Sequence, residues 1–234
     1  MTSAPAAGGR RRHRGAGRGL LFAPLLVFGV MTLAALGYIG YVLWPRWPAP
    51  PVDPDAPALP ITVAGVAFEL PPAAIRVPVQ RRPGAQERVD LAFLWPSLAP
   101  PEPSANSTAA PPAERVFVTI SAAGDGLDPT ERVRSVYLRY TAAAAAPGPA
   151  GLIVLAFREG TPYQGEDLIY DTETPSFLVR CSRNGAGPTP GICLYQRRIE
   201  GADITLRFPR DWLADWRTVV GTIDRLIARM HPRH

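Results

Sequence analysis

The chain has 234 residues, of which 47% are hydrophobic and 19% are charged. This length fits one or two compact units, and the apolar fraction is high enough to bury a core, so disorder throughout is excluded. The formal net charge of +5 would point to nucleic acid if the charge were spread over a folded domain.

The charge is not spread in that way. All 25 basic residues are arginines, and five of them lie before residue 20, where there is no acid. The other 20 arginines equal the 20 acids in number, so the rest of the chain is neutral. We therefore expect no nucleic-acid partner, and we attribute the absence of lysine to a GC-rich genome.

An uncharged segment of 24 residues runs from Leu20 to Leu43, with the sequence LLFAPLLVFGVMTLAALGYIGYVL. As a helix it would be about 36 Å long, enough to cross a hydrocarbon core of about 30 Å. We expect Pro24 in the first turn, where its missing N–H matters least. The sequence thus predicts one transmembrane helix over residues 20–44.

The arginines before this segment predict its orientation. By the positive-inside rule, residues 1–19 form a basic cytoplasmic tail and everything after Trp44 lies outside. Aromatic residues near the far end, Tyr38, Tyr41, Trp44 and Trp47, resemble an interfacial belt. The prediction is a single-pass protein of the bacterial inner (plasma) membrane, with the lipid bilayer as a partner and a periplasmic or extracellular domain.

A cleaved signal peptide is the alternative, because it has the same order of basic, apolar and polar regions. Its apolar region is normally about 7 to 15 residues long and ends in a small-x-small cleavage site. Here the run is longer and is followed by WPRWPAPP. This comparison favours a permanent anchor.

Proline content divides the remainder. Residues 45–60 are so rich in proline that we expect an extended linker, and the exported domain is expected over residues 61–230. A second proline-rich stretch, residues 96–112, is predicted to be a flexible loop within that domain. Residues 231–234 form a short tail.

The domain contains a series of short runs with β-strand character, several of them close enough for hairpins. A turn is expected at Gly65 and another at Glu200-Gly201. The predicted strands are Ile61 to Leu70 with the turn inside it, Arg88 to Trp95, Arg115 to Ala122, Leu152 to Phe157, Asp167 to Tyr170, Phe177 to Ser182, Ile192 to Ile199, and Ala202 to Phe208.

Two helices are predicted in the domain. One begins at Asp128-Pro129, a cap residue followed by proline at the first helical position, and continues to Tyr140. The other extends from about Pro209 to Met230 with a long apolar stripe, which we expect to pack on the sheet. The predicted fold class is α+β, a mainly antiparallel sheet of about six to nine strands covered by two helices and preceded by the transmembrane helix.

The two cysteines, Cys181 and Cys193, lie outside the membrane in the predicted topology, where disulfides form. A turn-rich loop joins the two predicted strands that carry them. We expect a structural disulfide, which would stabilise the fold by roughly 3 kcal/mol in the chain-entropy model. Metal binding would need more ligands, and a redox pair is usually CxxC.

The predicted domain lacks the residues that most enzyme mechanisms need. The only histidines after the membrane segment are His231 and His234, so a Ser-His-Asp, Cys-His or histidine-based zinc site is not expected. Without lysine there is no Schiff base, and no P-loop, dinucleotide-binding or HExxH motif occurs. We predict no cofactor and no metal.

Carboxylates are the remaining candidates, because two acids flanking a bond can cleave a glycoside. They concentrate in the segment REGTPYQGEDLIYD, where tyrosines add stacking surfaces; the residues are Glu159, Glu166, Asp167, Asp171, Tyr163 and Tyr170. A polar hairpin loop with solvated acids has the same composition, and we favour that interpretation.

The layout of tail, helix, spacer and domain resembles that of single-pass envelope proteins such as TonB-type energy transducers and division-complex scaffolds. The helix lacks the ionisable residue that TonB-type coupling uses. Our main hypothesis is a non-enzymatic binding or scaffolding module that contacts another envelope protein or the cell wall. The alternative is a carboxylate-dependent hydrolase that acts on envelope glycan.

Overall fold

The computed structural model describes residues 16–43, 52–53, 55–101, 114–123, 126–174, 177–185 and 190–232. The chain divides into two compact units, Met1–Ala49 and Pro50–His234, and each is described by itself. Most of the predicted tail, Trp44, Trp47, much of the proline-rich linker, residues 102–112 of the predicted loop and His234 lie outside the described residues.

The first unit contains helix α1 (Ala16–Leu43). Its segment Pro24–Leu43 has a mean hydropathy of 2.0, and none of that segment is buried in the protein. Large apolar side chains along it are widely exposed, from 49% at Ile39 to 73% at Leu43. By length and composition this helix can cross a bilayer, and a signal sequence has the same properties.

The position of Pro24 differs from our expectation. The helix begins at Ala16, so Pro24 lies inside it rather than in the first turn. We had placed the start at the first apolar residue, but a helical backbone depends on dihedral angles and hydrogen bonds, not on hydropathy. The cost is one missing backbone donor within the helix.

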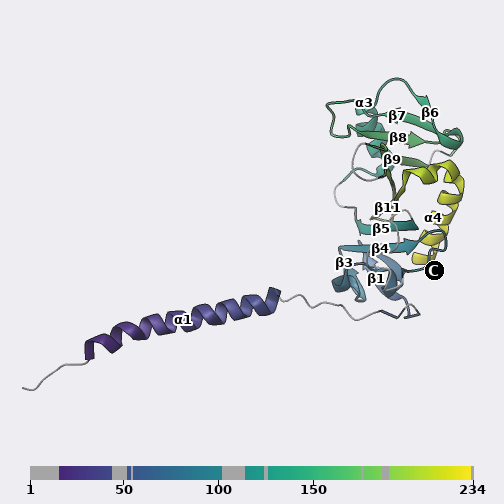
Figure 1. Cartoon of the computed structure of the whole chain (residues 1–234). Coiled ribbons are helices and arrows are strands. Elements are labelled where there is room, and N and C mark those ends of the chain that lie inside the picture. The colour runs from purple at the N-terminus through teal and green to yellow at the C-terminus, as the bar shows by residue number, and fades with distance from the viewer. Residues whose placement is uncertain are drawn as a thin grey trace, which may run out of the picture. The chain divides into compact units, whose positions relative to one another are not determined.

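The second unit is built on an eight-stranded sheet in which every neighbouring pair is antiparallel. The strand order is β4-β5-β11-β10-β9-β8-β7-β6 (Figure 1). This confirms the predicted α+β class and the mainly antiparallel sheet. The strands are β4 (Arg88–Leu94), β5 (Arg115–Ala122), β6 (Ala146–Pro147), β7 (Ile153–Ala156), β8 (Glu166–Tyr170), β9 (Leu178–Ser182), β10 (Ile192–Ile199) and β11 (Ala202–Pro209).

A smaller sheet lies beside the β4 end of the large one (Figure 1) and has the order β2-β1-β3. Its β1 (Leu59–Val63) and β2 (Val66–Leu70) form a hairpin, and β3 (Gly84–Gln86) pairs with β1 in parallel. The predicted turn is confirmed, because Ala64 and Gly65 have φ values of 53° and 83°, as a two-residue hairpin turn requires. We missed β3, since three small or polar residues carry no strand pattern.

Helix α4 (Trp216–Met230) covers one face of the large sheet and shares a single apolar core with it and with the small sheet (Figure 1). The helix expected from Pro209 is divided in the structure. Residues Arg210–Asp215 form a 3₁₀ helix, η7, and the backbone of Asp215 leaves the helical region before α4 begins. Shorter 3₁₀ turns are η1 (Pro72–Ala74), η2 (Pro78–Gln80) and η6 (Pro149–Gly151).

The helix predicted from Asp128-Pro129 to Tyr140 is present as three consecutive pieces. These are α2 (Pro129–Arg132), a π-helical turn η5 (Val133–Tyr137) and α3 (Leu138–Tyr140). We refer to the three together as helix 129–140. The side chain of Asp128 accepts a hydrogen bond from the Thr130 N–H at 2.9 Å, which satisfies one of the free donors of the first turn. The sequence did not indicate the π turn.

Cys181 and Cys193 lie directly opposite each other on β9 and β10 and form a disulfide. Both residues are fully buried in the core beneath α4. The disulfide therefore joins two central strands of the large sheet.

Candidate binding groove

The two faces of the large sheet differ sharply in chemistry. Along β11, the side chains of Ile204, Leu206 and Phe208 are buried toward α4, and we call this side of the sheet the closed face. Asp203, Thr205 and Arg207 alternate with them and point to the opposite side, the open face. An antiparallel sheet with this alternation has one face available to solvent.

Helix 129–140 covers only part of the open face. Val133 and Tyr137 pack on a small second core formed with Leu155, Phe157 and Leu168 of the β7–β8 end. Near its start, the Arg132 guanidinium donates a hydrogen bond to the Gln196 side chain on β10 at 3.2 Å. The helix thus spans from β7 to β10.

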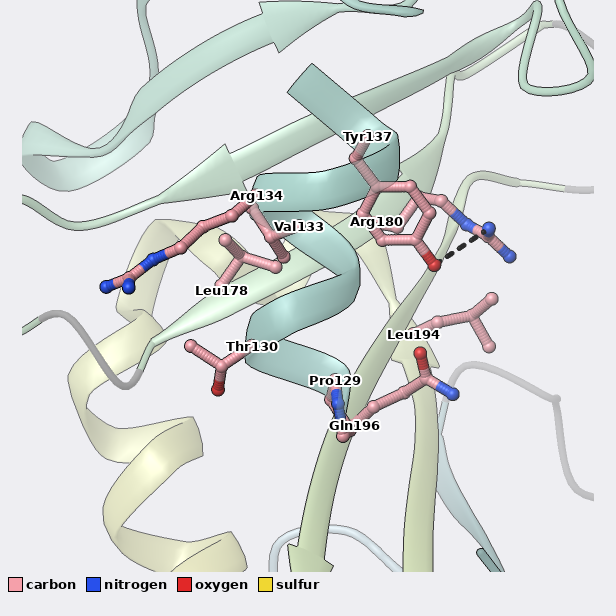
Figure 2. A pocket seen from close by; sticks show the side chains of 9 residues that line it. All are labelled: Pro129, Thr130, Val133, Arg134, Tyr137, Leu178, Arg180, Leu194 and Gln196. Carbon is pink, nitrogen blue, oxygen red and sulfur yellow. Dashed lines mark hydrogen bonds between the residues drawn. The ribbon is translucent and has the colours of Figure 1, made fainter. Parts of the chain in front are cut away.

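A groove with a cavity volume of about 160 Å³ lies between this helix and strands β9 and β10. Figure 2 shows the lining side chains, which come from the helix on one side and from the strands on the other. The lining residues are Pro129, Thr130, Val133, Arg134 and Tyr137 of the helix, Leu178 and Arg180 of β9, and Leu194 and Gln196 of β10. Apolar side chains and two arginines share this small space. The π turn lies in the groove wall, and such turns are frequent at functional sites.

The two arginines of the groove are in different situations. Arg180 is held in place, since its Nε lies 2.6 Å from Glu166 in an ion pair and its guanidinium lies 5.0 Å above the Tyr163 ring. It also donates a hydrogen bond to the Tyr137 hydroxyl at 3.3 Å (Figure 2). Arg134 is exposed, and no carboxylate in the described part of the chain pairs with it.

The predicted acids do not form a catalytic pair. Glu166 and Asp167 are consecutive in β8, so their side chains point to opposite faces of the sheet and cannot flank one bond. Asp167 is buried beneath two guanidinium groups, those of Arg183 at 2.8 Å and Arg210 at 2.6 Å. Both acids serve as ion-pair partners within the sheet.

The other residues of the predicted acidic segment are structural or solvated. The buried Asp171 carboxylate accepts a hydrogen bond from the Thr174 N–H at 2.7 Å. Glu159 is exposed in the loop before β8. Tyr163 packs edge-on against Tyr137 with ring centroids 5.1 Å apart, so its ring is part of the packing around the second core. Within the described residues, no group of three or more His, Cys, Asp or Glu side chains is suited to hold a metal.

The sequence analysis missed the groove. It placed both the helix and strands β9 and β10, but a groove depends on how a helix sits over a sheet. One signal was available: the runs RVFVTISA and ADITLRFP alternate polar and apolar residues, which indicates that one face of these strands meets solvent.

Comparison with known proteins supports only the fold. No protein-family model matches the chain, and no curated protein matches its sequence. A solved structure of an immunity protein of the Stenotrophomonas maltophilia type IV secretion system, Smlt3025, is similar with a TM-score of 0.55 and 16% identity, over 76% of this chain and 94% of that one. The iron-regulated outer membrane lipoprotein FrpD of Neisseria meningitidis has a TM-score of 0.45 and 10% identity, over 76% of this chain and 93% of the other. At 16% identity, the first likeness shows a shared fold and nothing more.

Proposed function

We propose that the chain is a non-enzymatic binding module held at the bacterial inner membrane by α1. In this proposal the basic tail is cytoplasmic, and the folded domain outside the membrane binds another protein of the envelope through the groove beside helix 129–140. The disulfide is compatible with this location, because disulfides persist in oxidising compartments outside the cytoplasm.

The observation that carries the binding role is the contrast between the acids and the groove. Two of the acids proposed from the sequence as catalytic candidates, Glu166 and Asp167, form ion pairs with arginines. The groove instead presents apolar side chains and Arg134, which pairs with no carboxylate in the described ranges, and a partner can contact these groups. No observation favours the hydrolase, whose two acids would have to face each other across a cleft.

The fold comparison adds support of a limited kind. A secretion-system immunity protein has the same fold, so this architecture occurs in a protein associated with secretion. The exposed apolar surface of α1 supports the anchor, since such a surface is stable in lipid and unfavourable in water.

Extraction and protease access test the anchor and its orientation. Full-length protein should stay in the membrane pellet after alkaline carbonate, and protease added to spheroplasts should digest the folded domain. Mature protein that begins after α1, or a domain that protease reaches only in lysed cells, would contradict the proposed anchor.

Photocrosslinking tests the binding role, and it suits a chain without lysine, which gives amine-reactive reagents few targets. A photoreactive residue in place of Thr130, at the rim of the groove, should yield an adduct with another envelope protein in intact cells. Thr218, an exposed threonine on α4, provides the matched control and should yield none. Equal yields from both positions, or no adduct from Thr130, would count against the groove.

A further inference from the structure

The groove is continuous with the uncovered part of the open face. Strand register places Arg180 opposite Leu194, Leu194 opposite Arg207, and Arg207 opposite Phe117. Directly opposite residues of antiparallel strands lie about 5 Å apart and point to the same side. Since Arg180 and Leu194 line the groove, one row of adjacent side chains leads out of it across β11 to β5.

This row is open to solvent beyond the helix. Arg207 is exposed, and Phe117 keeps part of its surface accessible, as does Thr205, which lies beside the row on the same face of β11. In the chain between β5 and helix 129–140, Gly126 lies beside β10, where its carbonyl oxygen accepts from Arg198 at 3.3 Å. No element in the described ranges covers these three side chains completely.

Two acids on this face, Asp90 and Asp203, are already paired with arginines. Asp90 accepts two hydrogen bonds from Arg88 and one from Thr119, each at 2.8 Å. Asp203 pairs with Arg198 at 2.7 Å.

Three arginines around the row have no carboxylate partner among the described residues. Arg207 makes only a 3.5 Å contact with the Thr119 hydroxyl, and Arg76 lies 4.7 Å above the Phe117 ring. Arg134 stands at the groove itself. The surface therefore carries three guanidinium groups, none in an ion pair with a described carboxylate, beside the apolar side chains of Phe117 and Leu194.

We propose that this surface, from Phe117 across Arg207 to the groove beneath Arg134, binds an acidic segment of a partner protein. The proposal rests on the binding role proposed above and specifies the chemistry of the partner. Carboxylates of the segment lie against Arg207 and Arg134, and an apolar side chain enters the groove. Charge complementarity of this kind orients a partner and accelerates association.

A protein fits this surface better than a nucleic acid does. Nucleic-acid binding relies on many phosphate contacts along a basic stripe. Here three arginines that pair with no described carboxylate surround partly exposed apolar side chains and a narrow groove, and the domain as a whole is neutral. Alternating charge and apolar contact is the composition of a protein interface.

The test places p-benzoylphenylalanine at position 117 of the full-length chain in intact cells. We expect an adduct with a protein whose crosslinked peptide is rich in Asp and Glu. Arg207→Glu and Arg134→Glu, each introduced beside the probe, should lower the adduct yield by about tenfold, and Arg207→Lys should retain most of it, because reversal of a rim charge weakens association. Arg229→Glu, on the exposed side of α4, is the matched control and should leave the yield unchanged.

The other outcomes overturn the inference. These are no adduct at position 117, an adduct indifferent to both reversals, an adduct to residues of this same chain, or an adduct to nucleic acid. An adduct from Thr130 without one from position 117 would leave the binding role intact while removing this surface. Absence of adducts from both positions would remove both proposals.

Discussion

The two faces of the large sheet differ in role: one face is buried in the core and stabilises the fold, and the other is available to bind a partner. Leu206 and Arg207 are neighbours on β11, yet Leu206 is fully buried in the core and Arg207 is exposed on the other side of the sheet. The closed face is continuous apolar packing with α4, the small sheet and the disulfide. The open face carries polar and apolar side chains and is only partly covered by helix 129–140, which leaves the rest for contacts with another molecule.

This difference predicts where substitutions act. Burial of apolar side chains is the main source of stability, so changes on the closed face should unfold the domain. Exposed polar positions contribute within about 0.5 kcal/mol, so a change at an exposed position of the open face, such as Arg207, should affect binding alone.

The largest effect is expected at Trp216 on α4. Its ring is buried and stacks on Phe177 at a centroid distance of 4.6 Å. Trp216→Ala should lower the free energy of unfolding by about 3 to 5 kcal/mol, from lost burial and the cavity left behind. Denaturant titration of full-length protein in detergent measures it, with exposed Thr218→Ala as the control. A loss below about 1 kcal/mol would show that the closed face is not the main core.

The disulfide should have the next largest effect. Replacing Cys181 and Cys193 together by alanine removes a constraint on the unfolded chain and should cost roughly 3 kcal/mol. The same titration, carried out with and without reductant on the unaltered protein, checks the value independently. Mass spectrometry should find one crosslinked peptide in native protein, and two free thiols there would contradict both the bond and the proposed compartment.

A smaller loss is expected at Asp167, the acid that our sequence analysis placed among the catalytic candidates. Asp167→Asn removes the charge that two arginines face, and the loss should be about 2 kcal/mol because those arginines are partly solvated. Glu159→Gln, in the exposed loop, should change little. Unchanged or increased stability in Asp167→Asn would show that its two ion pairs do not stabilise the fold.

The smallest effect concerns acid stability on the open face. Burial raises the pKa of Asp90, but hydrogen bonds led by those from Arg88 and Thr119 outweigh burial, and the net pKa is lowered. A carboxylate whose pKa is lowered by folding stabilises the folded state when the pH is above the ordinary carboxyl pKa of about 4. This contribution is lost as the pH falls below that pKa. Asp90→Asn should therefore be less stable than the unaltered protein at pH 7.

The difference between the two proteins should shrink at about pH 3, because Asp90 of the unaltered protein is then increasingly protonated, whereas the asparagine is neutral at every pH. Urea midpoints at the two pH values measure it, with exposed Glu87→Gln as the control. A difference that stays constant with pH would show that Asp90 does not gain from its partners.

The strands and helices could be predicted because the closed face imposes a pattern on the sequence. Alternation along β5 and β11 and the apolar stripe of α4 follow directly from burial on one side. The turn at Glu200-Gly201 was equally visible, and both residues have positive φ.

The groove and the ion pairs were not visible in the same way. Arg180 and Glu166, or Asp167 and Arg210, are distant in sequence, and only strand register brings them together. Acids in a hairpin segment carry no sign of whether arginines neutralise them. This is why the sequence suggested a site at Asp167 where the structure has a buried ion pair.

The most direct test of the division between the faces compares Leu206→Ala with Arg207→Glu in full-length protein that carries the photoreactive residue at position 117. For each variant the unfolding midpoint and the adduct yield are measured together. The account predicts that Arg207→Glu loses about tenfold in adduct with an unchanged midpoint, whereas Leu206→Ala loses about 2 to 5 kcal/mol of stability. An Arg207→Glu protein that unfolds more readily, or that keeps its full adduct, would contradict it.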